Sequence, residues 1–509
     1  MSLHTPLGAL TPDRLRAMKR GLEKESLRTT AAGDLALTPH PAALGSALQH
    51  PHITTDFCES QLEFITGTHG DAQSCLDELT RIHQVAYRAL GDEMLWVSSM
   101  PCALPTDETI PIGRYGTSNI GRAKSVYRMG LGHRYGRRMQ TISGIHYNWS
   151  LPGVDTDGYF ALIRNFRRHS FVLLRLFGAS PAVCASFVEG RNHNLQRIGS
   201  GSLHLPHATS LRMGRLGYQS DAQASLAISY NSLAEYGASL EDAMTRPYPA
   251  YEQLGVRNPG GEYNQLATTL LQIENEFYGS IRPKRVIRSG ERPLHALRDR
   301  GVEYVEVRCM DLDPFQPVGI DAATMRLLDL FLLHCVLSDS PPDTPAEIAA
   351  LGRNQHRCAE RGREPGLKLE RNGSWVVLDD WAGELLQELQ PMAHHLDGVF
   401  GGDAYQGAWE HAIAVLRDPQ LAPSARVLAA MQSDFGGSHC GFVQDRSQRA
   451  RQAVGALPYP DTLDAWARHM ARASLEAQHQ LEASDTLPFE EFRRRYLAQE
   501  HLRPVVQAA

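Results

Sequence analysis

Residues 21–28 read GLEKESLR, a short stretch in which two glutamates, Glu23 and Glu25, are separated by a single lysine. Successive side chains of a β-strand point to opposite faces of its sheet, so a strand here places both glutamates on one face. The stretch therefore predicts a strand whose polar face carries two carboxylates side by side.

Two further segments show a similar alternation of polar and apolar residues. In EYVEVR, residues 303–308, Glu306 shares a face with Arg308 while valines occupy the opposite face. In SGIHYNWS, residues 143–150, His146 lies opposite a face filled by isoleucine, tyrosine and tryptophan. If these strands belong to one sheet, its polar face carries a dense negative field.

A fourth strand-like segment adds two more acids. It reads TTDFCESQLEF over residues 54–64 and contains Asp56 and Glu63. The two acids are seven residues apart, so they fall on opposite faces of a regular strand. Either a bulge lies between them or Asp56 precedes the strand. Glu59 points with Glu63 on simple alternation and is interpreted as a structural acid.

Five acids and one histidine thus gather in segments that otherwise read as buried strands. Two carboxylates about 4 Å apart repel by roughly 4 kcal/mol at an effective dielectric near 20, so a cation is expected between them. Oxygen-rich ligation with one imidazole suits Mg²⁺ or Mn²⁺. For any single acid, pairing with a nearby arginine or lysine at a solvated surface remains an alternative. The set predicts a metal site formed by Glu23, Glu25, Asp56, Glu63, His146 and Glu306.

Length and composition describe an ordinary globular chain. It has 509 residues, of which 42% are hydrophobic and 21% charged, and a net charge of −6. This charge gives no general attraction to nucleic acid or to an anionic membrane. The longest apolar stretch, LLDLFLLHCVL, contains Asp329 and is too short to span a bilayer. The amino terminus lacks an apolar signal core. We expect a soluble, cytoplasmic monomer.

The eight cysteines show neither a CxxC pair nor the spacing of a zinc finger. They are expected to be reduced thiols that serve as small core residues, and a disulfide framework is not expected in a chain of this size. They are Cys58, Cys75, Cys102, Cys184, Cys309, Cys335, Cys358 and Cys440.

Helical periodicity divides the chain into two parts of one large catalytic domain, residues 1–509. The region of about 21–320 carries the strands and the site, and the region of about 321–509 is expected to be a helical scaffold without site chemistry. In the first part Gly21 is expected to end a helix that starts at Thr11, and the glycine-rich stretch 113–138 is expected to be a loop. Helices are predicted over 71–92, 160–178, 224–244, 321–338, 379–399, 404–417, 423–433, 461–484 and 487–499.

The usual nucleotide and hydrolase motifs are absent. The sequence contains no GxxxxGK[ST], no GxGxxG after a strand, no GxSxG and no HExxH. Phosphate chemistry would therefore rely on the metal site and on arginine or lysine. Arg308, on the face of Glu306, is the strongest candidate, and Lys284 lies in a basic run that follows residue 281.

Eight motifs follow one another along the chain. They are GLEKESLR, TTDFCESQLEFIT, YGTSN-GR-K, MQTISGIHYNWSLP, FGASPA, ATSLRMGRLGY, LQIENEFYG-IRPKR and GVEYVEVRCMDLDPF. Together they resemble the glutamate–cysteine ligases of γ-proteobacterial type. The resemblance covers residues 21–337 at the level of motifs and continues more weakly through the C-terminal helices.

The resemblance implies an α+β fold like that of glutamine synthetase, in which an antiparallel sheet curls into a funnel surrounded by helices, with a helical C-terminal part. It also implies two or three Mg²⁺ (or Mn²⁺) ions on the six residues proposed above, and ATP as co-substrate. Arg308 and Lys284 correspond to groups that stabilise the transferring phosphoryl group. Gln140 and Ile142, which share strand parity with His146, correspond to residues near adenine.

The remaining correspondences concern the amino-acid substrates. Arg212 is expected to bind a substrate α-carboxylate. The aromatic residues that match positions around the cysteine substrate are Phe57, Tyr127, Tyr218 and Tyr278.

The implied reaction joins the γ-carboxylate of L-glutamate to the amine of L-cysteine through a γ-glutamyl phosphate. It gives γ-glutamylcysteine, ADP and phosphate, the first step of glutathione biosynthesis. Two alternatives remain at this point. One is a related ATP-dependent carboxylate–amine ligase that uses another amine, and the other is a binding protein that has kept the fold without catalysis.

Overall fold

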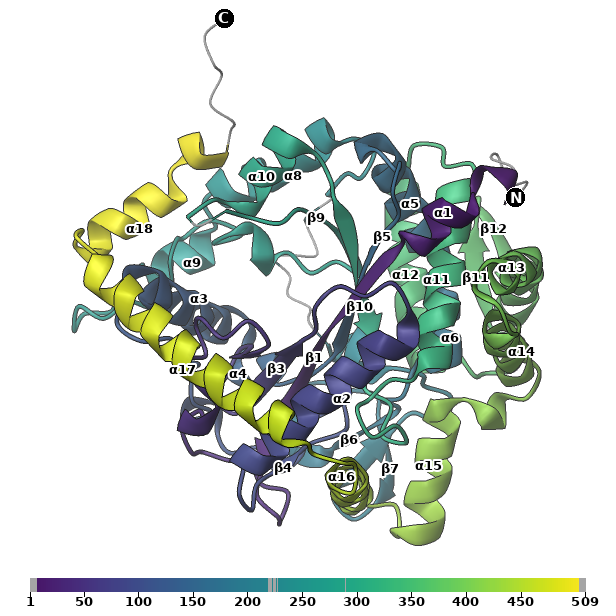
Figure 1. The fold of residues 1–509 in the computed structure, drawn as a ribbon, viewed down its shortest axis with the longest axis horizontal. Coiled ribbons are helices and arrows are strands. Elements are labelled where there is room, and N and C mark those ends of the chain that lie inside the picture. Colours follow the sequence, from purple (N-terminus) through teal and green to yellow (C-terminus); the bar gives the residue numbers. More distant parts are fainter. Residues whose placement is uncertain (1–6, 218–221, 223–225, 227, 289, 503–509) are drawn as a thin grey trace, which may run out of the picture.

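The computed structural model describes residues 7–217, 222, 226, 228–288 and 290–502 (Figure 1). At its centre lies a seven-stranded antiparallel sheet with the order β2-β3-β1-β5-β10-β9, in which β4 also pairs with β1. The α+β architecture expected from the sequence is confirmed. The strands of this sheet are β1 (Lys19–Thr29), β2 (Ile53–Thr55), β3 (Gln61–Ile65), β4 (Met94–Leu95), β5 (Ile145–Ser150), β9 (Ile281–Lys284) and β10 (Tyr304–Met310).

The register of these strands brings the predicted polar faces together. Glu25 of β1 lies opposite Glu63 of β3, and Glu23 lies opposite His146 of β5. On the far side of β5, Asn148 is in register with Glu306 of β10. Four segments that are far apart in the sequence therefore form one continuous polar surface.

The opposite face of the sheet is covered by helices and forms the core. Helix α2 (Ala72–Ala89) packs against β1 and β3, and α5 (Thr156–His169) packs against β9 and β10. Helix α11 (Ala322–Leu337) contacts both of these helices. The apolar residues that alternate with the site residues, among them Leu22, Tyr147 and Val305, are all buried in this core.

Asp329, the single acid in the longest apolar stretch, is paired inside the core. Its Oδ2 lies 2.9 Å from Nη2 of Arg20, and both side chains are fully buried. The Tyr147 hydroxyl donates to Oδ1 of the same carboxylate at 2.7 Å. Because a buried charge must be paired and hydrogen-bonded, this cluster joins α11 to β1 and β5 behind the site.

Two expectations for the N-terminal half are wrong. Gly21 does not end a helix: α1 (Pro12–Arg16) has already ended, and the glycine lies inside β1. The glycine-rich stretch 113–138 is largely the helix α3 (Asn119–Tyr135), followed by α4 (Arg137–Gln140). Its glycines serve close packing, since a Cβ at Gly121 would lie 2.2 Å from a backbone oxygen.

Residues 224, 225 and 227 of the helix predicted over 224–244 lie outside the described residues, and the described part of that helix begins later than expected. Helix α8 covers Leu233–Thr245, because the Ser232 side chain accepts a hydrogen bond from the Glu235 amide and caps it there. The predicted helix over 160–178 is present as α5 and α6 (Phe171–Phe177). The other elements of this half are α9 (Pro249–Leu254), α10 (Pro293–Arg300), β6 (Ala182–Cys184), β7 (Gln196–Gly199) and β8 (Ser202–His204).

The C-terminal part is mainly helical, as expected, and six predicted helices are present. They are α11, α13 (Leu378–Phe400), α14 (Ala404–Arg417), α15 (Pro423–Asp434), α17 (Asp461–Ser484) and α18 (Phe489–Leu497). Three elements were missed: α12 (Pro345–Arg361), α16 (His439–Gly455) and the hairpin of β11 (Lys368–Arg371) with β12 (Ser374–Val377). Within the described ranges, no helix is long and apolar enough to cross a membrane.

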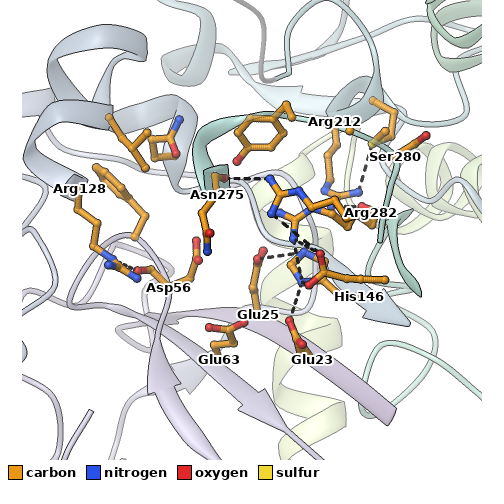
Figure 2. A pocket seen from close by; sticks show the side chains of 18 of the residues that line it. Glu23, Glu25, Asp56, Glu63, Arg128, His146, Arg212, Asn275, Ser280 and Arg282 are labelled. Atoms are coloured by element: carbon orange, nitrogen blue, oxygen red, sulfur yellow. Dashed lines mark hydrogen bonds and ion pairs between the residues drawn. The ribbon is translucent and has the colours of Figure 1, made fainter. Parts of the chain in front are cut away.

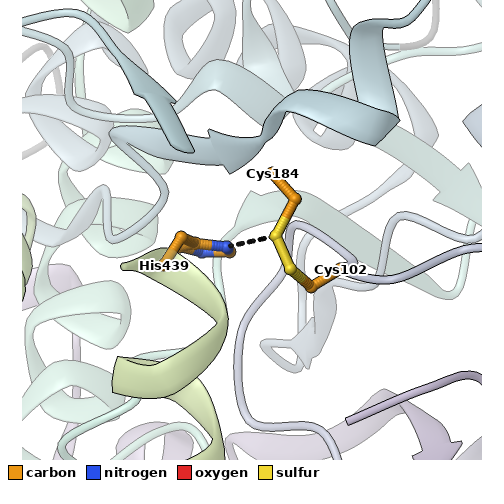
Figure 3. Close-up of side chains that lie close together, drawn as sticks. All are labelled: Cys102, Cys184 and His439. Carbon is orange, nitrogen blue, oxygen red and sulfur yellow. Dashed lines mark hydrogen bonds between the residues drawn. A yellow bond between two sulfur atoms is a disulfide. The ribbon is translucent and has the colours of Figure 1, made fainter. Parts of the chain in front are cut away.

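Two cysteines are joined in a disulfide, which contradicts the expectation of eight reduced thiols. Cys102, in the chain after β4, is bonded to Cys184 of β6, 82 residues away (Figure 3). The Nδ1 of His439, at the start of α16, lies 3.7 Å from the Cys184 sulfur. Local spacing could not reveal this pair because only the fold brings the loop and the strand together. The other six cysteines are free thiols, and all but Cys440 are buried.

Candidate active site

The polar face of the sheet forms the floor of a cavity of about 390 Å³ (Figure 2). The floor comes from β1, β3, β5, β9 and β10, and the walls come from α3, the short helix Leu211–Met213 and the segment 275–280. The six predicted metal ligands all line it. With them lie Phe57, Lys124, Tyr127, Arg128, Leu131, Gln140, Arg212, Met213, Gly214, Asn275, Tyr278, Gly279, Ser280, Arg282, Lys284, Arg308 and Gln355.

Asp56 reaches the cavity from a turn. Strand β2 ends at Thr55 and β3 begins at Gln61, so Asp56 precedes the strand that carries Glu63. This is one of the two arrangements that the sequence allowed, and no bulge is needed to explain it. The Asp56 backbone oxygen accepts hydrogen bonds from the Tyr115 hydroxyl and from Nε of Arg128. These two contacts fix the turn in place and leave the Asp56 carboxylate at the cavity.

Glu59 in the same turn has the structural role expected for it. Its carboxylate accepts hydrogen bonds from the His40 amide at 2.9 Å and from the Arg114 amide at 2.8 Å. It is buried and is not among the residues that line the cavity. Glu59 therefore joins two loops beside the site.

One cluster of ligand atoms surrounds His146. Its Nδ1 lies 3.0 Å from Oε2 of Glu23 and 3.9 Å from Oε1 of Glu306. The other ring nitrogen, Nε2, lies 3.7 Å from Glu25. Burial and the nearby Arg308 guanidinium lower the pKa of His146, which favours the neutral imidazole that a metal requires.

A second group of acids lies beside the first, at the β1–β3 side of the floor. Burial and the neighbouring Asp56 raise the pKa of Glu25 to about 8. Burial, Asp56 and Glu23 raise the pKa of Glu63 well above its ordinary value. These carboxyls thus resist ionisation without a cation, as expected of oxygen ligands whose counter-charge is a metal ion. The donor set fits a hard divalent cation.

The opposite side of the floor is cationic. The Glu306 carboxylate, 1% exposed, lies 3.0 Å from Lys284 Nζ, 3.0 Å from an Arg308 nitrogen and 4.0 Å from an Arg282 nitrogen. Although burial opposes it, attraction from Lys284 and Arg308 holds the pKa of Glu306 well below its ordinary value. The cavity therefore changes from acidic to basic across the sheet, from β3 to β9.

Arg212 is held at the edge of the cationic side. One terminal nitrogen donates to the backbone oxygen of Arg308 at 2.8 Å, and another lies 3.7 Å from Asp311. Its Nε is buried and has no hydrogen-bond partner within the described ranges. A Cβ at Gly144 would lie 2.0 Å from the guanidinium, so glycine is required there for Arg212 to occupy this position.

Three of the four predicted aromatic residues line the cavity: Phe57, Tyr127 and Tyr278. Phe57 is almost fully buried and packs in a cluster with Leu131, while burial and Glu276 raise the pKa of Tyr127 well above its ordinary value. Tyr218 lies outside the described residues.

Of the two residues expected near adenine, only one lines the cavity. Gln140 is the last residue of α4 and lines the cavity, with its side-chain nitrogen buried and unpartnered. Ile142 is fully buried in a hydrophobic cluster with Met139 and Leu211 and is not among the lining residues. The assumed strand parity with His146 is wrong, because β5 begins only at Ile145.

Sequence reasoning missed several lining residues. Lys124 and Arg128 lie on α3, in the stretch that was expected to be a loop; burial and Arg128 lower the pKa of Lys124 to about 8. Asn275 went unnoticed, although its neighbours Glu274 and Glu276 in the ENE motif make structural ion pairs. Gln355 of α12 shows that the C-terminal part also contributes to the cavity, and no sequence signal marked it.

Comparison with known proteins agrees with this geometry. Residues 9–358 match the family model described as glutamate-cysteine ligase. A "Glutamate--cysteine ligase" of Azotobacter vinelandii is 49% identical over 505 residues, which cover 95% of each chain. The crystal structure of glutamate–cysteine ligase from Francisella tularensis in complex with AMP superposes with a TM-score of 0.90 at 35% identity and covers 95% of this chain and 98% of that one.

A second solved structure matches only part of its own length. A bifunctional glutathione synthetase from Pasteurella multocida superposes with a TM-score of 0.68 at 26% identity, covering 88% of this chain and 54% of that chain. The family match spans most of the present sequence, and the relative from A. vinelandii is similar over nearly its full length. This chain belongs to the glutamate–cysteine ligase family.

Proposed function

We propose that this ligase uses the cavity above its central sheet to join the γ-carboxylate of L-glutamate to the amine of L-cysteine with ATP. The products are γ-glutamylcysteine, ADP and phosphate. The observation that supports this most directly is the gradient of charge across one floor, from the Glu25–Glu63 pair to the Lys284–Arg308 pair. Such a floor can hold cations at one side and phosphate oxygens at the other.

Two groups of side chains would hold Mg²⁺ or Mn²⁺. Glu23, His146 and Glu306 offer ligand atoms that all lie within 4.8 Å of one another. The second group consists of Glu25, Asp56 and Glu63; burial and the charge of Asp56 raise the pKa of both glutamates. When bound, the cations neutralise phosphate and carboxylate oxygens so that the two anionic substrates can approach. Each group would hold one ion, so these side chains account for two. A third ion would need ligands supplied by ATP.

Reaction begins when the γ-carboxylate oxygen of glutamate attacks the γ-phosphorus of ATP and the bond to the ADP oxygen breaks. Arg308 and Lys284 would donate hydrogen bonds to the equatorial phosphate oxygens, where charge spreads in the transition state. The Lys284 side chain is 30% exposed, so its ammonium group can reach a ligand while it stays near Glu306. The chain needs no nucleophile of its own.

The cysteine amine then attacks the acyl carbon of γ-glutamyl phosphate and expels phosphate. Arg212 would bind a substrate α-carboxylate through its guanidinium, whose Nε has no hydrogen-bond partner among the described residues. Phe57, Tyr127 and Tyr278 would surround the thiol side chain, for which aromatic walls are suited. Gln140 would contact the nucleotide through its amide nitrogen. Ile142 would not contact the nucleotide and would support the site only through its hydrophobic cluster.

We further propose that the chain acts as a monomer and as one catalytic unit. The cavity takes its lining from both parts of the chain, since Gln355 of α12 contributes to it together with the strands.

Trapping the acyl phosphate tests this function. Hydroxylamine, ATP and glutamate without cysteine should yield the γ-glutamyl hydroxamate with stoichiometric ADP. Lys284→Met should abolish both hydroxamate and dipeptide formation, whereas Lys19→Met, a lysine of β1 that does not line the cavity, should not. An enzyme that makes dipeptide at the normal rate but never forms hydroxamate would contradict the stepwise route.

A further inference from the structure

Asn148 lies beside the predicted metal ligands, although no sequence pattern marked it. It is two residues beyond His146 on β5 and in register with Glu306 of β10. Its side-chain nitrogen, Nδ2, donates a hydrogen bond to Oε1 of Glu23 at 2.9 Å. Asn148 is thus the neutral side chain beside three residues that would hold a cation.

Two neighbours on β5 hold the Glu23 carboxylate from two sides. The His146 Nδ1 lies 3.0 Å from Oε2, and the Asn148 amide holds Oε1. A carboxylate can only accept hydrogen bonds, so the amide must turn its nitrogen toward Glu23. Its oxygen, Oδ1, is consequently buried and accepts no hydrogen bond from the part of the chain that the structure describes. The orientation of the amide is therefore set by Glu23.

Without this hydrogen bond, Glu23 would be drawn elsewhere. The Lys284 ammonium attracts its carboxylate, and the Glu306 carboxylate repels it. The Lys284 Nζ lies 3.0 Å from Oε1 of Glu306, so the same ammonium group acts on both carboxylates. A neutral donor at position 148 holds the Glu23 carboxylate without adding another charge.

We propose that Asn148 is a positioning residue of this site: its Nδ2 fixes Oε1 of Glu23, so that Oε2 faces the position shared with His146 and Glu306. This inference rests on the proposed function, in which those three residues hold a divalent cation. It differs from direct ligation, in which the Asn148 oxygen itself would bind the ion. Residues that orient a ligand in this way affect metal affinity by about 10- to 100-fold.

Direct binding of Mn²⁺ to the full-length protein, followed by the electron paramagnetic resonance of the free ion, tests this role without turnover. Asn148→Ala should raise the Mn²⁺ dissociation constant by about 10-fold or more. Asn148→Asp keeps the shape, removes the donor and adds a charge beside Glu23, so binding should be weakened at least as much. Ser150→Ala, two residues farther along the same face of β5, is the matched control and should bind as the wild type does.

The variants separate positioning from other roles. Mn²⁺ binding by Asn148→Asp as tight as that of the wild type would overturn the proposal and make residue 148 an oxygen ligand. Unchanged binding by Asn148→Ala would also overturn it. If the alanine variant does not fold in a melt with EDTA, the isosteric aspartate variant provides the same test. Failure of the wild type itself to bind Mn²⁺ would reject the proposed cation site, and this inference with it.

Discussion

Replacing Glu25 with glutamine should stabilise the cation-free protein at high pH. Glu25 is 5% exposed, and burial together with the nearby Asp56 raises its pKa from the ordinary 4.5 to about 8. In the unfolded chain this carboxyl ionises near pH 4.5, whereas in the folded protein it keeps its proton until about pH 8. The folded state therefore binds more protons between these values, and its stability falls as the pH rises through this window.

The size of the effect follows from the two pKa values. A difference between 4.5 and about 8 corresponds to roughly 4.8 kcal/mol. This stabilisation is fully present below pH 4.5 and is lost as the pH rises through this window to about pH 8. With an unfolding entropy of about 2.1 cal/mol/K for each of 509 residues, this amounts to roughly 4 °C in melting temperature. Glutamine has no proton to lose, so the variant should avoid this part of the decline.

Thermal melts in EDTA at about pH 5 and about pH 9 measure the difference. Glu63 and other groups titrate in both proteins, so the comparison is between the two slopes and not between absolute melting temperatures. The wild type should lose roughly 4 °C more than Glu25→Gln over this range. Excess Mg²⁺ should raise the melting temperature of the wild type more than that of the variant at high pH. Equal slopes of melting temperature against pH for the two proteins in EDTA would refute the argument that ionisation of Glu25 destabilises the folded state.

Three further outcomes are expected. Glu306→Gln should lower the free energy of unfolding in EDTA by about 3 kcal/mol, because it removes the buried anion to which Lys284 and Arg308 are paired. Urea denaturation measures this, and an unchanged or higher stability would contradict the ion-pair assignment. Tyr278→Ala should raise KM for cysteine several-fold in steady-state assays and leave KM for ATP nearly unchanged, whereas equal increases would mark the tyrosine as structural. Thiol titration of the unfolded, unreduced protein should find six reactive groups and eight after reduction, and eight in both would exclude the bond between Cys102 and Cys184.

The expected effect of Glu306→Gln differs from what the sequence suggests. Five acids on one face imply mutual repulsion, so that removing any one charge would stabilise the metal-free state. The structure places Glu306 among three cations and Glu25 among acids. Two ligands that look equivalent in the sequence therefore have opposite electrostatic surroundings and should respond oppositely to the same substitution.

Local periodicity determined which strand residues face the site. Glu23, Glu25, His146 and Glu306 were assigned to one polar surface from alternation alone, and the paired strands confirm it. The turn at Asp56 was one of two options that alternation left open. Most C-terminal helices were also predicted, because their apolar periodicity is long and regular.

Other features depended on contacts that no local pattern contains. The helix over Asn119–Tyr135 was mistaken for a loop because its glycines serve close packing against distant segments. Gln355 reaches the cavity only because α12 packs against the short helix that carries Arg212. The disulfide joins residues 82 positions apart, and their spacing gave no indication of it.

The sequence by itself determined the chemistry of this protein: the acids, the imidazole, the arginines, and the side of each strand on which they lie. The period of two is a property of a single strand, so it can be read without knowing the partner strands. Only the tertiary structure decided which groups meet, since pairing and register are set by hydrogen bonds between strands distant in the sequence. That pairing placed Glu306 beside Lys284 and Arg308, Glu25 opposite Glu63, and Asn148 against Glu23.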